Sequence, residues 1–234
     1  MKEMIIVGMQ KLTLLDFPGK VACTLFTKGC NMRCPFCHNA SLVVRANEQK
    51  PYDNDELLAF LKKRVGLLDG VAITGGEPTL MPGLADFMRE VKALGYKVKL
   101  DTNGTRPDTL EKIIDEGLVD YVAMDIKNSP EKYGVTVGFD QSYDLTPIIR
   151  SKELLMHRRV DFEFRTTVAN PLHTREDIIK IGEWLRGDEK VFLQQFKDSG
   201  DTIGMGISPY NEKEMEDFLN ALLPFVPNAQ LRGL

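Results

Sequence analysis

Six short apolar segments, each followed by a stretch with helical spacing of its apolar residues, constrain the fold of this chain more than any other feature. The apolar segments are predicted strands, and they cover residues 21–26, 70–74, 97–102, 121–126, 161–168 and 191–196. The predicted helices begin at Asp53 and near residues 82, 107, 145, 175 and 212. Strands that alternate with helices form a parallel sheet with right-handed crossovers. The pattern therefore predicts an α/β fold, either as a partial barrel or as a doubly wound open sheet.

The six units follow one another without a low-complexity linker, so we expect a single domain over residues 1–234. Within it, residues 1–20 form a predicted lead-in, residues 21–200 the core, and residues 201–234 a C-terminal helix and tail. The net charge of −4 gives no electrostatic argument for binding nucleic acid or an anionic membrane. The apolar run Met4–Met9 is too short for a signal peptide or a membrane span, so we expect a cytoplasmic protein.

All four cysteines lie between positions 23 and 37, and three of them form the array Cys30-x3-Cys34-x2-Cys37 directly after the first strand. A disulfide framework would scatter its cysteines and belongs to secreted chains, so clustered cysteines favour metal binding or redox chemistry. Three thiolates from one loop can hold three irons of a four-iron cluster and leave the fourth iron open. An open metal site can bind and activate a small molecule.

Other interpretations of the cysteines remain open on these residues alone. A structural zinc site would need Cys23 or His38 as its fourth ligand. The segment Cys34-Pro-Phe-Cys-His38 also fits a redox dithiol, which leaves Cys30 unexplained, or a haem attachment motif, which generally needs an exported chain. Cys23 lies inside the first strand, where we expect a buried packing residue. The roles of His38 and His173 stay undecided.

Polar residues gather where the predicted strands end. They are the segments Thr74-Gly-Gly-Glu-Pro78, Asp101-Thr-Asn-Gly104 and Asp125-Ile-Lys127, then Arg165 to Thr167, and Gln194 with Gln195. The carboxyl ends of parallel strands meet at one side of a sheet, and ligands bind there. We therefore expect the cysteines, carboxylates, amides and a lysine to share one cavity.

Several of these residues could contact a ligand. The glycine pair Gly75-Gly76 would let the backbone approach a ligand closely, and Glu77 can accept hydrogen bonds from an ammonium group. Lys127 suits a carboxylate, a task that Arg165 could share. Asp101 and Asp125 could hold a small monovalent cation, or could simply cap helices or pair with lysines.

The array Cys30-x3-Cys34-x-Phe36-Cys37, followed by Gly75-Gly-Glu77, resembles the radical S-adenosylmethionine (radical SAM) superfamily over nearly the whole chain. Within it, three further segments resemble the glycyl-radical-enzyme activating enzymes. These segments are Cys37-His-Asn39, Leu100-Asp-Thr-Asn-Gly104 and Met124-Asp-Ile-Lys127. The ends of the chain are most similar to activating proteins of anaerobic ribonucleoside-triphosphate reductase, through the segments Gly8–Leu12, Asp16–Gly19 and Leu231–Gly233.

This resemblance implies a partial (β/α)6 barrel of the radical SAM type, with a [4Fe–4S] cluster on the three cysteines and bound S-adenosylmethionine. It implies that Phe36 borders the adenine and that Gly75, Gly76 and Glu77 meet the methionine amino group. The other implied S-adenosylmethionine neighbours are Asp101, Thr102, Asn103, Asp125, Lys127 and Arg165. No catalytic residue is implied beyond the cluster and the cofactor.

The implied reaction is reductive cleavage of S-adenosylmethionine to a 5′-deoxyadenosyl radical, which takes a hydrogen atom from a glycine of a large partner enzyme. The implied partner is anaerobic ribonucleotide reductase, and the implied electron donor is a low-potential protein such as flavodoxin or ferredoxin. Three alternatives remain: an activating enzyme for pyruvate formate-lyase, a radical SAM enzyme that acts on a small molecule, and a zinc-bound structural or adaptor protein.

Overall fold

The computed structural model describes residues 4–157, 159–187, 190–198 and 200–234. Its strands are β1 (Ile6–Thr13), β2 (Ala22–Thr27), β3 (Gly70–Gly75), β4 (Lys97–Thr102), β5 (Tyr121–Asp125), β6 (Asp161–Val168), β7 (Val191–Gln195) and β8 (Gln230–Arg232). Its α-helices are α1 (Ala40–Val43), α2 (Asn54–Lys62), α3 (Leu84–Ala93), α4 (Pro107–Asp115), α5 (Tyr133–Thr136), α6 (Thr146–Met156), α7 (Arg175–Trp184) and α8 (Glu212–Leu222). Short 3-10 helices cover Ala46–Glu48, Pro78–Leu80 and Pro130–Lys132.

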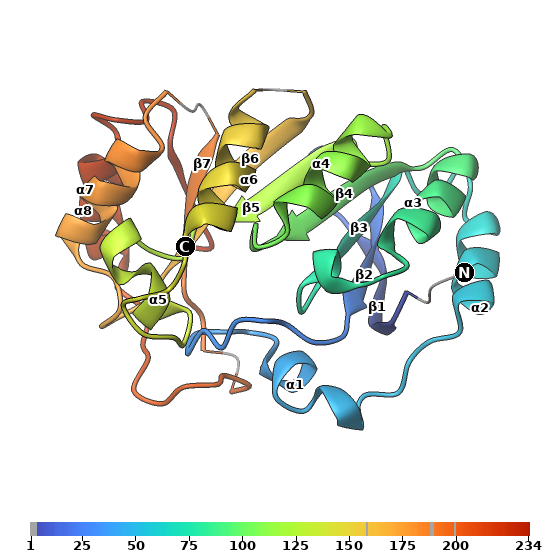
Figure 1. Ribbon diagram of the computed structural model, residues 1–234, viewed down its shortest axis with the longest axis horizontal. Helices are drawn as coiled ribbons and strands as arrows, with labels where there is room; N and C mark the ends of the chain where they lie inside the picture. Colours follow the sequence, from blue (N-terminus) through green and yellow to red (C-terminus); the bar gives the residue numbers. More distant parts are fainter. Residues whose placement is uncertain (1–3, 158, 188–189, 199) are drawn as a thin grey trace.

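The strands form one curved sheet in the order β1 to β8, with the longer helices on its outer side and α1 in the loop that crosses its open side (Figure 1). Strands β2 to β8 run parallel, each hydrogen-bonded to the next, and β1 pairs antiparallel with β2. β1 and β8 are the two edges, so the sheet is a barrel that remains open. The predicted α/β fold and partial barrel are confirmed. The structure adds two strands that we did not predict, β1 in the lead-in and β8 in the tail.

Side chains that alternate along each strand divide between two layers. On β4, Val98 and Leu100 are fully buried in the main apolar core, with side chains of the surrounding helices. Lys99 and Asp101, at the intervening positions, lie on the inner face of the sheet and pair with each other. Helix α2 begins with a side-chain cap, because the Asp53 side chain accepts hydrogen bonds from the backbone amides of Asp55 and Glu56.

The amino ends of the strands are closed by residues from both ends of the chain. Phe17, from the turn after β1, is buried, and its ring centroid lies 6.2 Å from that of Tyr121. Beside it, Arg232 of β8 makes a two-pronged ion pair with the buried Glu163, at 2.7 and 2.8 Å. The Tyr121 hydroxyl donates to the same carboxylate at 2.8 Å. We call Tyr121, Glu163 and Arg232 the base group.

Among the described residues, no helix combines the length and apolar character needed to cross a membrane.

Candidate functional site

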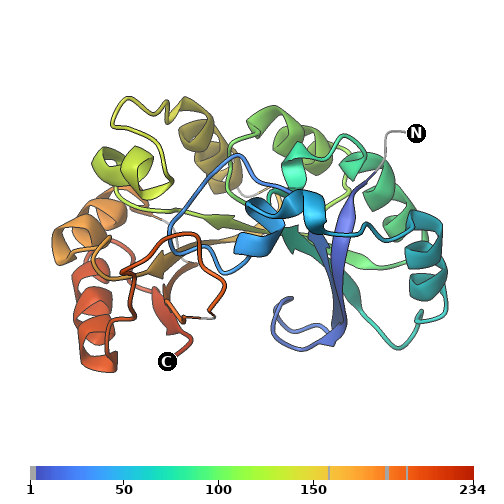
Figure 2. The ribbon, with the colours of Figure 1, turned by 90° about the horizontal axis from the view of Figure 1, so that it is seen from below.

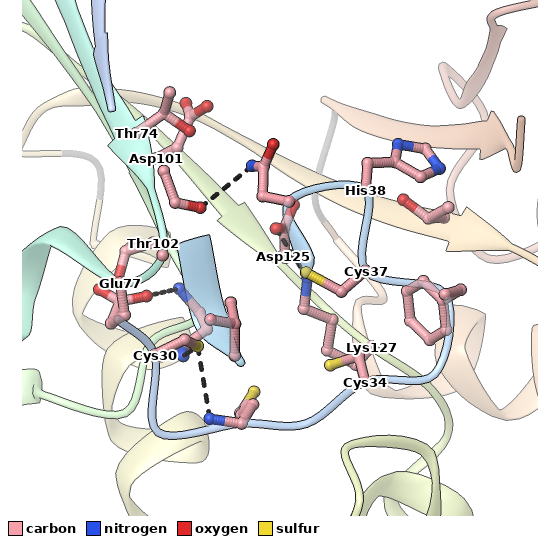
Figure 3. Close-up of a pocket in the computed structure, with 18 of the residues that line it drawn as sticks. Cys30, Cys34, Cys37, His38, Thr74, Glu77, Asp101, Thr102, Asp125 and Lys127 are labelled. Carbon is pink, nitrogen blue, oxygen red and sulfur yellow. Dashed lines mark hydrogen bonds and ion pairs between the residues drawn. The ribbon is translucent and has the colours of Figure 1, made fainter. Parts of the chain in front are cut away.

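A cavity lies at the carboxyl ends of the strands, beside the loop that follows β2 (Figure 3). All thirteen residues predicted as metal or cofactor contacts line it: Cys30, Cys34, Phe36, Cys37, Gly75, Gly76, Glu77, Asp101, Thr102, Asn103, Asp125, Lys127 and Arg165. Other lining residues are Met32, His38, Asn39, Val43, Thr74, Thr167 and Gln194. The fold thus brings together residues that are up to 164 positions apart in the sequence, from Cys30 to Gln194.

The cysteine loop is held against the end of β3 by close backbone packing. The Asn39 side chain donates to the Gly75 carbonyl at 3.1 Å, and the Glu77 amide donates to the Gly29 carbonyl at 2.7 Å. A Cβ atom on Gly76 would lie 1.7 Å from the Gly29 carbonyl oxygen. Gly76 therefore makes room for the cysteine loop itself, and any other residue there would push that loop away, whereas Gly75 allows a close approach to the backbone at the end of β2.

A second segment, the loop after β7, holds the cysteine loop from the opposite side (Figure 2). The Gly204 amide donates to the Pro35 carbonyl at 2.8 Å. Asp201 accepts from the Ser41 amide at 3.1 Å and pairs with Arg45 at 2.8 Å. The three thiols are thus carried on a loop that is fixed on both sides.

The three thiols have the chemistry expected of cluster ligands. Burial raises the pKa of each, that of Cys34 to about 12, while the nearby Lys127 ammonium favours the thiolate form. Metal binding displaces such protons, so the donor set fits an iron–sulfur cluster. In the described part of the chain, no three His, Cys, Asp or Glu side chains converge closely enough to hold one metal ion. A four-iron cluster makes no such demand, because each thiolate binds a different iron.

Cys23 lies away from the cavity. Its side chain is fully buried in the apolar core of β2, and burial raises its pKa to about 12. Its predicted role in packing is confirmed.

Glu77 is buried at the bottom of the cavity and is almost saturated by hydrogen bonds. Its carboxylate accepts from the Asn103 amide at 2.7 Å, from the Thr102 hydroxyl at 2.8 Å, and from both the amide and the hydroxyl of Thr79. Burial raises its pKa against the opposing effect of these donors. The carboxylate therefore ties the end of β3 to the end of β4, and its predicted contact with an ammonium group stays a prediction.

Five charged side chains alternate in sign across the ends of β4, β5 and β6, and we call them the mouth group. Arg165 donates to Asp125 at 3.0 Å and to Asp101 at 3.4 Å, Lys127 pairs with Asp125 at 2.9 Å, and Lys99 pairs with Asp101. Burial would raise the pKa of Asp125, but Arg165 and Lys127 hold it at about 2. Three cations face two carboxylates, so the group carries one excess positive charge.

This pairing bears on the small cation predicted at Asp101 and Asp125. Both carboxylates are already neutralised by side-chain cations, so the structure lends that site no support. Lys99, which is 2% exposed, was not among the predicted site residues. Its position two residues before Asp101 on a strand was a usable signal, because such residues share one face.

His38 and His173 differ in their positions relative to the cavity. His173 is fully buried behind the cavity, where its Nε2 lies 2.8 Å from the Lys127 carbonyl oxygen and its ring meets the edge of Phe36. His38 lines the cavity and lies against Phe196, with 5.3 Å between ring centroids. His173 therefore supports the cavity wall, whereas His38 faces the cavity itself.

Three comparisons with known proteins agree with this geometry. The model of the Radical SAM superfamily matches residues 24–222. A protein of Methanocaldococcus jannaschii, named as a candidate glycyl-radical enzyme activating enzyme, is 31% identical over 98% of this chain and 96% of its own length. The pyruvate formate-lyase-activating enzyme of Staphylococcus epidermidis is 26% identical over 93% of this chain and 85% of its own. Native anSMEcpe with bound AdoMet has the same fold, with a TM-score of 0.64 at 20% identity over 88% of this chain and 62% of that one.

Proposed function

The chain belongs to the radical SAM superfamily and, within it, to the glycyl-radical-enzyme activating enzymes, and we propose that it installs a glycyl radical in anaerobic ribonucleoside-triphosphate reductase. The observation that carries the proposal is the meeting of three thiols with four members of the mouth group, all but Lys99, in one cavity at the carboxyl ends of the strands. When bound, a reduced [4Fe–4S] cluster supplies the electron that cleaves S-adenosylmethionine to the radical that abstracts the glycine hydrogen.

The residues of this chain would bind and orient that cofactor. Cys30, Cys34 and Cys37 would hold three irons, since they are the cavity's three thiols. The excess positive charge of the mouth group suits the methionine carboxylate, with Lys127 as a candidate donor. Lys127 lies 5.9 Å from the centroid of the Phe36 ring, which would place the aromatic adenine contact beside the carboxylate contact.

The remaining predicted contacts would act through shape and position. Gly75 and Gly76 allow the cysteine loop to lie against the end of β3, so the bound methionine would meet backbone there. Glu77 fixes Thr102 and Asn103 at the end of β4. Such fixed donors matter because the selectivity of a radical depends on what is held within reach.

The choice of ribonucleotide reductase as partner rests on the similarity of both chain ends to activating proteins of that enzyme. A second candidate is pyruvate formate-lyase, which the likeness to the Staphylococcus epidermidis enzyme over 93% of this chain favours. The barrel is open at its side, which suits a peptide loop presented by a large partner of either kind.

The test is electron paramagnetic resonance after anaerobic mixing with each partner enzyme, S-adenosylmethionine and a reductant. We expect a glycyl doublet in anaerobic ribonucleotide reductase with wild-type protein and none with Cys34→Ala. Flavodoxin and ferredoxin can then replace the chemical reductant. A doublet in pyruvate formate-lyase alone would support the second candidate. A colourless protein that holds one zinc ion and no sulfide would overturn both.

A further inference from the structure

The three thiols of the cavity differ in what donates to their sulfur atoms. The Cys30 sulfur receives the Met32 amide at 3.3 Å and the side-chain amide of Asn103 at 3.7 Å. The Asn103 contact crosses from the end of β4 to the cysteine loop and joins residues 73 positions apart. Among the described residues, Asn103 is the one whose side-chain N–H group donates to a thiol of the cavity.

The orientation of the Asn103 amide is fixed by its neighbours. Its Oδ1 accepts from the Thr105 backbone amide at 3.0 Å and from the Thr105 hydroxyl at 2.7 Å. A backbone N–H can only donate, so this end of the side chain must be the oxygen and the NH2 must face the other way. That NH2 group donates to Asn31 Oδ1 at 3.0 Å and points at the Cys30 sulfur.

The backbone of Asn103 is held as firmly as its side chain. Its amide donates to the buried Glu77 carboxylate at 2.7 Å, and Asn103 is itself 5% exposed. Asn31 continues the network, because its own NH2 donates to Thr105 Oγ1 at 3.0 Å. The donor is therefore placed in advance at the sulfur, and it would not have to move when a thiolate forms there.

We propose that Asn103 is a positioning residue that donates a hydrogen bond to the Cys30 thiolate and thereby raises the reduction potential of the cluster. The inference rests on the cluster assigned to Cys30, Cys34 and Cys37 under the proposed function. An N–H donor stabilises the more negative, reduced cluster more than the oxidised one. Hydrogen bonds to the sulfur atoms therefore raise the reduction potential of the cluster. A higher reduction potential would make it easier for an electron donor to reduce the cluster.

Two substitutions separate this role from a purely structural one. Asn103→Ala removes both the donor and the acceptor. Asn103→Asp has the same shape and keeps the acceptor for Thr105, but it replaces the NH2 at the sulfur with a carboxylate oxygen. If Asn103 only held the loop, Asn103→Ala would leave the potential of an assembled cluster unchanged, and Asn103→Asp would lower it through its charge alone. If Asn103 acts on the thiolate, Asn103→Ala lowers the potential as well, and Asn103→Asp lowers it further because a negative charge opposes reduction.

The experiment is a redox titration of the anaerobically reconstituted protein in the absence of S-adenosylmethionine. The reduced cluster is monitored at each potential by electron paramagnetic resonance. We expect Asn103→Ala to lower the equilibrium constant for reduction about threefold to tenfold, where tenfold is about 59 mV for one electron. We expect Asn103→Asp to lower it further. Equal potentials in wild type and Asn103→Ala, or a potential for Asn103→Asp closer to wild type than that of Asn103→Ala, would overturn the inference.

A second pair of variants keeps the test decisive if both Asn103 variants fail to bind iron. Thr105→Val removes the hydroxyl that orients the Asn103 amide and leaves Asn103 in place, whereas Thr105→Ser retains the hydroxyl. We expect a small downward shift of the potential in Thr105→Val and none in Thr105→Ser, and equal potentials would contradict the proposal. Iron and sulfide analysis of the wild type tests the proposed function separately, because a protein without a cluster fails at that step.

Discussion

The mouth group and the base group are two buried sets of charges on the inner face of one sheet, and they are built differently. In the base group, one arginine meets one glutamate through two hydrogen bonds, and the Tyr121 hydroxyl adds a third. In the mouth group, three cations share two carboxylates in a chain that ends at Lys127 beside the cavity. The first set balances its own charge, and the second leaves one positive charge over.

The difference indicates what each set does. A buried ion pair that is fully satisfied contributes to the fold chiefly because removing one partner leaves an unpaired charge. A set with an excess charge at the wall of a cavity is suited to an anionic ligand. The two sets share β5 and β6, and β6 carries Glu163 and, two residues later, Arg165. We infer that the base group, toward the amino ends of the strands, stabilises the fold, and that the mouth group, at their carboxyl ends, binds the ligand. Four predictions test this division.

The largest effect is expected from substitution of the three cysteines that line the cavity. Cys30→Ala, Cys34→Ala and Cys37→Ala should each abolish cleavage of S-adenosylmethionine, because each removes one attachment of the cluster. Cys23→Ala is the matched control, since its side chain lies in the apolar core. Product analysis by chromatography checks both. A Cys23→Ala protein that cannot assemble its cluster would show that the assignment of ligands is wrong.

The next effect concerns the base group. Arg232→Met leaves the buried Glu163 carboxylate unpaired, and we expect a loss of about 3 kcal/mol in the free energy of unfolding. This is the low end for such a change, because the Arg232 side chain is 36% exposed. Denaturant unfolding measures the loss. The affinity of the folded protein for S-adenosylmethionine should not change, and a large fall in affinity would break the division between the two groups.

The opposite pattern is expected at Lys127. Lys127→Met should weaken S-adenosylmethionine binding about tenfold, which corresponds to about 1.4 kcal/mol. The free energy of unfolding should fall less than in Arg232→Met, because Asp125 keeps its hydrogen bond from Arg165. Calorimetric titration of the reconstituted protein gives the affinity. Unchanged binding together with a large loss of stability would make the mouth group a second structural set.

The smallest effect is a dependence of stability on pH through His173, which supports Lys127 from behind. Burial lowers the pKa of His173 below its ordinary value of 6.5, so below pH 6.5 the unfolded chain binds a proton that the folded chain does not. Its contribution to stability is complete above pH 6.5 and is lost as the pH falls, by at most about 1.4 kcal/mol per pH unit. His173→Gln should flatten the fall measured between pH 6.5 and 5.5. Parallel curves for the two proteins would exclude this role.

The main architecture could be predicted from the sequence because the spacing of apolar residues and the turn residues are local features of the chain. All six predicted strands and their helices are present, and the three loop cysteines share one cavity with most of the strand-end residues, whereas Thr166 and Gln195 do not line it. The edge strands β1 and β8 were not predicted, since pairing defines them more than composition does. β8 has three residues, and the partner of its Arg232 lies 69 positions away.

Within the site, the residues were predictable but their mutual contacts were not. Asp101 and Asp125 were expected near the ligand, yet the pairing of both with Arg165 depends on the adjacency of β4, β5 and β6. The donors to Glu77 likewise converge only once β3 and β4 lie side by side. The resemblance of the chain ends pointed to a partner, whereas Phe17 and Arg232 close the end of the barrel opposite the cavity.

The central claim is that Cys30, Cys34 and Cys37 would hold an iron–sulfur cluster in the cavity beside the positively charged mouth group. Electron paramagnetic resonance of the reduced, reconstituted protein, with and without S-adenosylmethionine, tests it most directly. We predict a [4Fe–4S]+ signal in the wild type that changes shape when S-adenosylmethionine is added and changes less at the same concentration in Lys127→Met. A cluster signal that S-adenosylmethionine leaves unaltered, or a protein that binds no iron, would contradict the claim.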